Sequence, residues 1–110
     1  MGCSDVAGIY QWETADLLIK LDGDGIFANT TDIVVSIVQG AARTDYHKAD
    51  LVVDEDAGTI EIHMSQEDAG KYMAAKATVQ VNILYATGER DVSETGCIEI
   101  LGNLYGQVME

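Results

Sequence analysis

Short runs in which apolar and polar residues alternate recur along this chain, and they restrict its fold more than any other feature of the sequence. The clearest run is 79–85, where Val79, Val81, Ile83 and Tyr85 are separated by polar residues or by Leu84. Side chains two apart on a strand share a face, whereas the faces of a helix repeat about every 3.6 residues. The run therefore predicts a β-strand with one buried face.

Similar runs occur at roughly ten-residue spacing with turn residues between them. They are 10–12, 17–21, 33–38, 51–53, 60–64, 79–85 and a last run up to Ile98 and Ile100. The run 33–38, apolar except for Ser36, is typical of a strand that is central in its sheet. Runs 51–53 and 60–64, joined by an acidic turn that ends in Gly58, predict a hairpin. About seven short strands without a strong helix indicate an all-β, antiparallel two-sheet sandwich.

The chain is expected to form one domain. Its 110 residues match the size of a single domain and are enough for one core. Proline is absent, so no proline-rich linker divides the chain. We interpret residues 1–110 as a single β-sandwich domain with about eight frayed residues at the N-terminus.

Two acidic turns raise the question of calcium binding. The segment 22–25, Asp-Gly-Asp-Gly, has the carboxylates and glycines that a calcium loop needs. In the register of an EF-hand, however, the first ligand position would fall on Lys20 and the twelfth on Thr31. We therefore interpret 22–25 as a turn, and leave weak calcium binding there or at 54–56 open.

The charge of the chain is strongly negative. Nineteen Asp and Glu oppose six Lys and Arg, for a formal net charge of -13. Nucleic-acid phosphates and anionic membranes repel such a surface, so neither is an expected partner. The charge helps to keep a β-protein in solution and suits cations or basic partners.

No apolar run reaches the roughly 20 residues that span a bilayer, and residues 1–5 do not start a signal peptide.

The sequence offers no set of residues for catalysis. It has neither a Gly-x-Ser-x-Gly motif nor a phosphate-binding glycine loop, so we expect no enzymatic activity. His47 follows Asp45 by two residues, and His63 follows Glu61 in the same way, which predicts two His–carboxylate pairs on strand surfaces. Two His without a third ligand make a weak metal site, and we predict neither a metal nor a cofactor.

Cys3 and Cys97 are the two cysteines of the chain. They are too few for a metal cluster or a disulfide framework. We expect Cys97 to pack inside the last strand and no structural disulfide to form.

Residues 65–72 interrupt the alternation where the chain turns between two strands. Ser65 is placed to cap a single helical turn, with Asp68 three residues later. The stretch Asp68-Ala69-Gly70-Lys71-Tyr72 resembles the tyrosine corner of immunoglobulin domains, in which the Tyr hydroxyl bonds to the backbone. The family's Cys two residues later falls on Ala74. The resemblance implies an immunoglobulin-like sandwich without the family's disulfide.

A second resemblance covers most of residues 9–101. It is carried by 9–17 (IYQWETADL), 59–68 (TIEIHMSQED) and 79–88 (VQVNILYATG). In their order and spacing, these stretches resemble the N-terminal domain of phage baseplate upper proteins of Gram-positive hosts. The resemblance implies a non-enzymatic, prophage-encoded virion or tail structural protein, assembled in the bacterial cytoplasm. Its partners would be other phage structural subunits or further copies of itself.

Subunit contacts are expected to form through apolar side chains that remain exposed. The candidates are Leu18, Leu84, Leu104, Tyr105, Val108 and Met109. For the tail, the alternative is that it covers the domain's own core.

The alternative function is a module that binds a carbohydrate or a cell-surface ligand by stacking on aromatic side chains. The candidates for that role are Tyr10, Trp12, Tyr46 and Tyr105.

Overall fold

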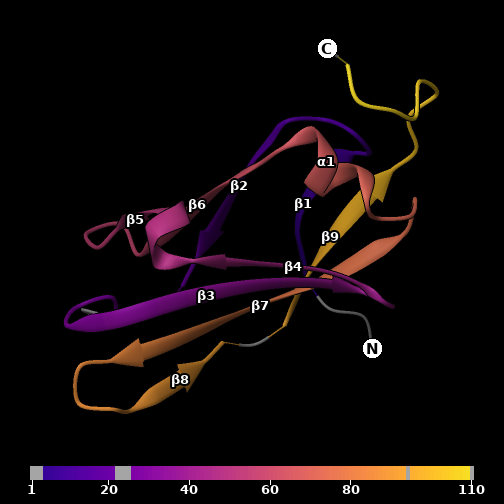
Figure 1. Ribbon diagram of the computed structural model, residues 1–110. Coiled ribbons are helices and arrows are strands. Elements are labelled where there is room, and N and C mark those ends of the chain that lie inside the picture. The colour runs from indigo at the N-terminus through magenta and orange to yellow at the C-terminus, as the bar shows by residue number, and fades with distance from the viewer. Residues whose placement is uncertain (1–3, 22–25, 94, 110) are drawn as a thin grey trace.

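The chain folds into two β-sheets that pack face to face (Figure 1). The computed structural model describes residues 4–21, 26–93 and 95–109. The larger sheet contains β1 (Ser4–Tyr10), β9 (Gly96–Leu101), β7 (Lys76–Tyr85), β3 (Thr30–Gln39) and β4 (Ala42–His47) in that order, and β8 (Arg90–Val92) also pairs with β7. The smaller sheet contains β2 (Ala15–Lys20), β6 (Thr59–Met64) and β5 (Leu51–Asp54) in that order. The prediction of an all-β, two-sheet sandwich is confirmed.

Two short helices connect strands among the described residues. They are η1 (Lys48–Asp50) and α1 (Gln66–Gly70). Neither has the length and apolar composition that crossing a membrane would require.

The strand order is that of an immunoglobulin-like domain. The chain alternates between the sheets so that β2, β5 and β6 form one sheet and β3, β4, β7 and β9 lie in the other. Two details differ from the expectation. The described residues form nine strands, and β1 pairs with β9 in parallel, from Ser4 opposite Gly96 to Tyr10 opposite Leu101. The other strand pairs are antiparallel.

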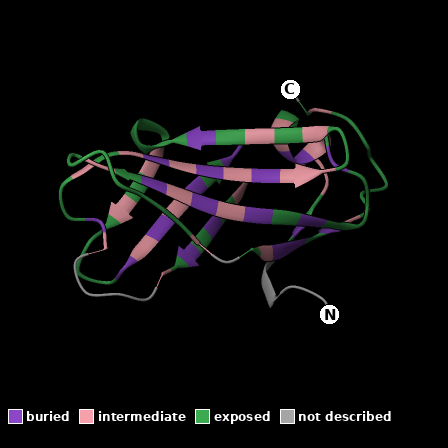
Figure 2. Cartoon of the chain, turned by 90° about the horizontal axis from the view of Figure 1, so that it is seen from below, coloured by how far each residue is buried: buried purple, intermediate pink, exposed green. Residues whose placement is uncertain are grey.

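The core lies between the sheets because alternate side chains of facing strands point inward. The inward-facing residues of β3, Ile33, Val35 and Ile37, are fully buried, as are Ile60 and Ile62 of β6. Figure 2 shows buried residues alternating with intermediate and exposed ones along the strands. Each fully buried Ile or Val side chain contributes about 1.5–3 kcal/mol by its removal from water. The alternating runs predicted the buried faces of β2, β6 and β7 correctly, and run 33–38 predicted the central position of β3.

The β5–β6 hairpin turns at Gly58, as predicted. Gly58 has a φ of 69°, which is unfavourable for residues with a side chain. Its N–H donates to the carbonyl of Asp54 over 2.9 Å, and a Cβ at this position would lie 2.9 Å from the carbonyl oxygen of Leu21. Glycine is therefore required here for both conformation and space.

The corner between β6 and β7 is held by side-chain hydrogen bonds. The Ser65 hydroxyl accepts from the Asp68 N–H over 3.1 Å and caps α1, as its position predicted. The buried Tyr72 hydroxyl donates to the carbonyl of Ile37 over 3.1 Å and is 2.7 Å from the Thr44 hydroxyl. Tyr72 thus joins the corner to β3 and β4, and its bond to a backbone carbonyl is the kind of bond that the resemblance to the tyrosine corner implied.

The first strand differs from the expected run 10–12. It begins at Ser4, within the stretch expected to be frayed, and ends at Tyr10. Trp12 lies in the following turn with a φ of 66°. Its indole packs against Gly70, where a Cβ would overlap the ring. The alternation of Tyr10 and Trp12 therefore comes from a strand end and a turn, which a run of three residues does not distinguish.

Two strands lack the expected pattern. β4 occupies the polar stretch around 43–48, and Tyr46 is its one buried residue. β8 has all three residues exposed. Both lie at the margin of the larger sheet, where one neighbour and little burial leave no run of alternating apolar residues.

Cys97 is buried in β9, as predicted, but it is disulfide-bonded. This corrects the expectation that no structural disulfide forms. Cys3, the other cysteine of the sequence, lies outside the described residues, as does the acidic turn 22–25 with its calcium alternative.

Candidate functional site

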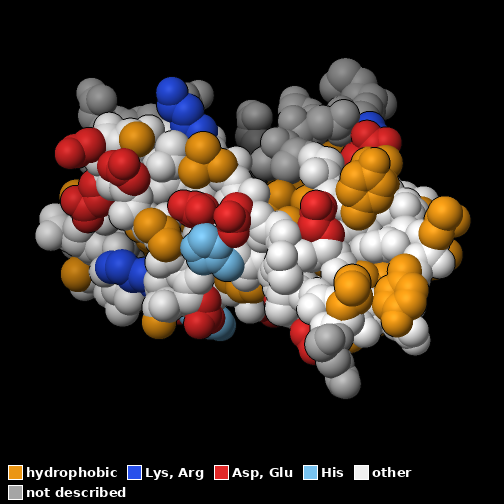
Figure 3. Space-filling model, turned by 90° about the horizontal axis from the view of Figure 1, so that it is seen from above, with side chains coloured by type: hydrophobic (Ala, Val, Ile, Leu, Met, Phe, Trp, Pro, Cys, Tyr) orange, Lys and Arg blue, Asp and Glu red, His pale blue; other side chains and the backbone are white. Residues whose placement is uncertain are grey.

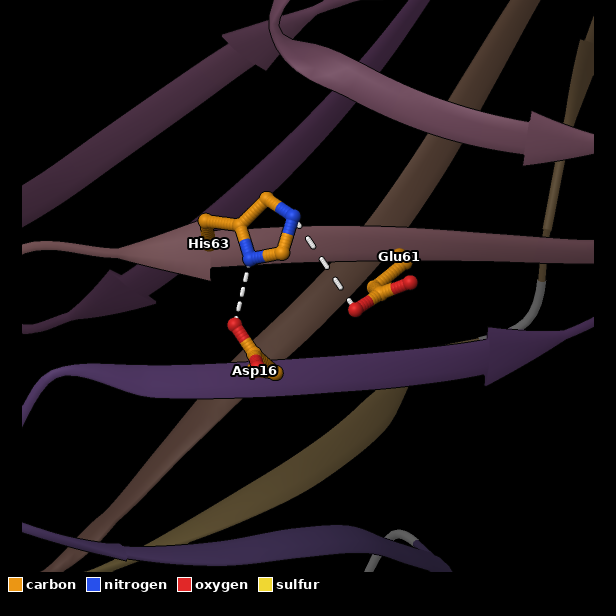
Figure 4. Close-up of side chains that lie close together, drawn as sticks. All are labelled: Asp16, Glu61 and His63. Atoms are coloured by element: carbon orange, nitrogen blue, oxygen red, sulfur yellow. Dashed lines mark hydrogen bonds and ion pairs between the residues drawn. The ribbon is translucent and has the colours of Figure 1, made fainter.

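Three side chains of metal-ligand type meet on the outer face of the smaller sheet (Figure 4). Asp16 comes from β2, and Glu61 and His63 come from β6. Asp16 lies directly opposite His63 in the antiparallel register, so their side chains share a face. Glu61 is two residues before His63 and shares the same face. The two adjacent strands thus place all three side chains together.

The side chains of Asp16, Glu61 and His63 lie close to one another and are open to solvent. The Nδ1 of His63 is hydrogen-bonded to the carboxylate of Asp16, and its Nε2 lies 3.9 Å from an oxygen of Glu61. One ligand atom from each side chain lies within 4.8 Å of the other two. The hydrogen bond to the Asp16 carboxylate is the main cause that raises the pKa of His63, and the negative charges of Asp16 and Glu61 add to it. The site therefore concentrates negative charge around one imidazole.

Sequence reasoning found the Glu61–His63 pair but missed Asp16. Asp16 and His63 are 47 positions apart, and only the register between β2 and β6 brings them together. The alternating runs could not predict that register, because alternation within a strand indicates its inward face but does not identify the strand that pairs with it.

The second histidine has a different partner from the one predicted. His47 Nδ1 bonds to the carboxylate of Asp32 over 2.9 Å, whereas Asp45 bonds to Ser36 and Arg43. The hydrogen bond to Asp32 raises the pKa of His47, and the same bond is the largest cause that lowers the pKa of Asp32. Among the described residues, this pair has no third ligand-type side chain near enough to share an ion.

Large hydrophobic side chains gather at the end of the sandwich that carries the tail (Figure 3). Asn103 donates to the carbonyl of Gln11 over 2.8 Å, and the Met109 N–H donates to Gln66 over 2.8 Å. These bonds hold the tail against the β1–β2 turn and α1. We call the exposed large hydrophobic residues of the tail and of the segments bonded around it the apolar end; they are Tyr10, Met73, Leu104, Tyr105 and Met109.

The six predicted interface residues do not form one surface. Leu104, Tyr105 and Met109 belong to the apolar end, and Val108 beside them is half-buried. Leu18 is exposed on the outer face of the smaller sheet, and Leu84 is exposed on that of the larger sheet. Tyr10 and Met73 were not among the candidates, because nothing in the runs showed that the β1 end and the corner adjoin the tail.

The aromatic candidates for sugar stacking are also separated. Tyr10 and Tyr105 are about half exposed at the apolar end. Trp12 is half-buried with its ring against Gly70. Tyr46 is buried, and its hydroxyl donates a hydrogen bond to Asp68. Its ring is therefore not accessible for stacking on a sugar.

A cavity of about 430 Å³ opens between the edge of β2 and the strands β7 and β8. Its described lining combines aliphatic residues, such as Ile19, Val79 and Val81, with polar ones, of which Lys20 and Asp91 are charged. It holds none of the predicted site residues.

Comparison with known proteins gives no family. No protein-family model matches the chain, and no curated protein matches it significantly. One similar solved structure is that of Drosophila OTK, extracellular domains 3-5, with 13% identity and a TM-score of 0.40. The match covers 90% of this chain and 33% of that one, so the chain spans about a third of that structure's length. A similarity at this level says nothing about function.

Proposed function

We propose that this chain is a non-enzymatic structural domain of a phage or prophage particle, associated with the tail or baseplate, that works through contacts with other subunits. The observation that carries the proposal is the apolar end. Met73 is 74% exposed and Tyr105 56% exposed, and the other three residues of the apolar end are exposed on segments that hydrogen bonds join to one another. A cluster of this kind on a small domain is typical of a surface that a partner covers.

The exposure of the two His–carboxylate sites supports a non-enzymatic role. The two His–carboxylate sites lie on exposed outer faces of the sheets, whereas catalytic groups generally converge in a concave, water-excluding site. The acidic surface, with a net charge of -13, favours partners with basic surfaces around the apolar end.

The proposal is tested on particles from the source strain after prophage induction. Mass spectrometry of pelleted particles, compared with the soluble fraction, should find this chain in a fixed ratio to capsid or tail proteins. If particles form and the chain remains in the soluble fraction, the particle role is wrong.

Matched variants test whether the apolar end makes the contact. Tyr105→Asp places a charge in the apolar end, and Val52→Asp places one on the outer face of β5, where Val52 is similarly exposed at 53%. We expect Tyr105→Asp to reduce incorporation into particles at least ten-fold and Val52→Asp to leave it unchanged. Equal incorporation of both variants would assign the contact to another surface.

The alternative function is carbohydrate or cell-surface binding, and the observation that favours it is the exposure of Tyr10 and Tyr105 at the same end. Aromatic faces of this kind stack on sugar rings. A glycan screen with the wild-type chain and with Tyr105→Ala separates the two functions. A hit that the substitution abolishes would support the alternative, and a screen without hits would remove it.

A further inference from the structure

The cluster of Asp16, Glu61 and His63 combines one imidazole with two carboxylates on a single rigid surface. We propose that it binds a divalent transition-metal ion, with Zn²⁺ as the best match to these ligands. Zn²⁺ takes His nitrogen and carboxylate oxygen ligands, and sites with three protein ligands leave one position for water or another molecule. An all-oxygen site would instead favour Ca²⁺ or Mg²⁺.

The three ligand side chains are close enough to bind one ion after they rotate. Ligand atoms around a tetrahedral Zn²⁺ lie about 3.4 Å apart, given metal–ligand distances of about 2.1 Å. The present atoms lie within 4.8 Å of one another. The Asp16 contact is at Nδ1 of His63 and the Glu61 contact is at Nε2 (Figure 4), so binding needs one nitrogen to face both carboxylates. All three side chains are solvent-exposed or half-buried, which leaves them free to make this rotation.

The backbone beneath the cluster does not need to move. Asp16 and His63 are held opposite each other by the β2–β6 register, which continues without interruption from Ala15 to Lys20. The ligands therefore come from two hydrogen-bonded strands rather than from a loop, and strands position a site more accurately than loops do.

The charge of the cluster also favours a cation. Among the ion pairs of the described residues, His63 is the one basic partner of Asp16 and of Glu61. With a neutral imidazole the site carries two negative charges, which a divalent ion balances. The net charge of -13 of the whole chain raises the local concentration of cations further.

The chain contains its own matched control. His47 forms a similar exposed pair with Asp32 over 2.9 Å, but no third ligand among the described residues lies close enough to complete a site. A loss of binding that follows His63 and not His47 therefore identifies the cluster rather than histidine in general.

The experiment is a titration of the untagged, metal-free chain with ZnCl₂ by isothermal calorimetry, with the melting temperature as a second measurement. We expect one ion per chain and a rise in melting temperature, because a ligand of the folded state stabilises it. His63→Gln and Asp16→Asn should each weaken binding by about ten-fold or more, whereas His47→Gln should change it less than two-fold. CaCl₂ at the same concentrations should not compete.

Two results would overturn the proposal. One is the absence of saturable binding at one ion per chain. The other is a loss in His47→Gln as large as that in His63→Gln. Because the substituted side chains are exposed, the variants are expected to fold, and their circular dichroism spectra check this.

Discussion

The hydroxyl of Tyr46 donates a hydrogen bond to the carboxylate of Asp68 over 2.8 Å, which joins β4 to the α1 corner. Tyr46 is 7% exposed. Burial, followed by the adjacent Asp68, raises the pKa of Tyr46, so the hydroxyl keeps its proton and stays a donor. Hydrogen bonds to charged groups contribute about 1.5–3 kcal/mol. We expect Tyr46→Phe to lower the free energy of unfolding by about this amount in urea denaturation.

The control for this prediction is Tyr105→Phe. Tyr105 is 56% exposed, and the loss of an exposed hydroxyl should change stability by less than about 0.5 kcal/mol. A Tyr46→Phe variant as stable as wild type would show that water replaces the bond without cost.

The contact between Trp12 and Gly70 gives a second prediction. A Cβ at Gly70 would overlap the indole ring, so Gly70→Ala must displace Trp12. Overpacking of this kind costs about 1–3 kcal/mol. Because Trp12 is the single tryptophan of the chain, its fluorescence maximum should shift to longer wavelength as the ring becomes more exposed.

Gly102→Ala is the matched control for that substitution. Its Cβ would meet Ala74 at 3.8 Å, an ordinary contact. We expect neither a shift in the emission of Trp12 nor a loss of stability. If Gly70→Ala leaves the emission unchanged, the indole does not pack on this glycine in solution.

The sequence predicted those parts of the fold that depend on the pattern within one strand. The buried faces of β6 and β7, the central position of β3, the hairpin at Gly58 and the Ser65 cap each follow from a few neighbouring residues, and all are observed. β4 and β8 were missed because their outward-facing polar residues carry no alternation.

The parts that depend on pairing between distant segments could not be predicted. The Asp16–His63 contact requires the β2–β6 register, and the His47–Asp32 bond requires the β3–β4 register. A shift of one residue in either register would move these side chains to the opposite face. The runs specify which residues face inward, but several registers satisfy that condition, and the choice among them is made by the packing of both sheets together.

The disulfide of Cys97 gives a third prediction. Removal of a native disulfide from a small domain costs about 2–5 kcal/mol, so reduction should lower the melting temperature of the chain. Cys97 is buried, and Cys97→Ala removes the bond while keeping a small side chain there. We expect the variant to melt at the temperature of the reduced wild type and to be insensitive to reductant. A wild-type melting temperature that reductant leaves unchanged would show that the bond contributes nothing to stability.

The His47–Asp32 pair gives a fourth prediction, which concerns pH. The bond raises the pKa of His47 above its ordinary value of 6.5 and lowers that of Asp32 below 3.8. The contribution of His47 is therefore fully present below pH 6.5 and is lost as the pH rises through its folded pKa. That of Asp32 is present above pH 3.8 and is lost as the pH falls through its own folded pKa. The pair stabilises the fold most between these limits.

NMR titration of the two histidines measures this directly. In the wild type, His47 should titrate above 6.5, and Asp32→Asn should return its pKa towards that value. His63 is bonded to Asp16 on the other sheet, so its titration should not change in Asp32→Asn and serves as the internal control. A His47 that titrates at its ordinary pKa in the wild type would show that solvent disrupts this exposed bond, because ion pairs at such positions are weak and sensitive to salt.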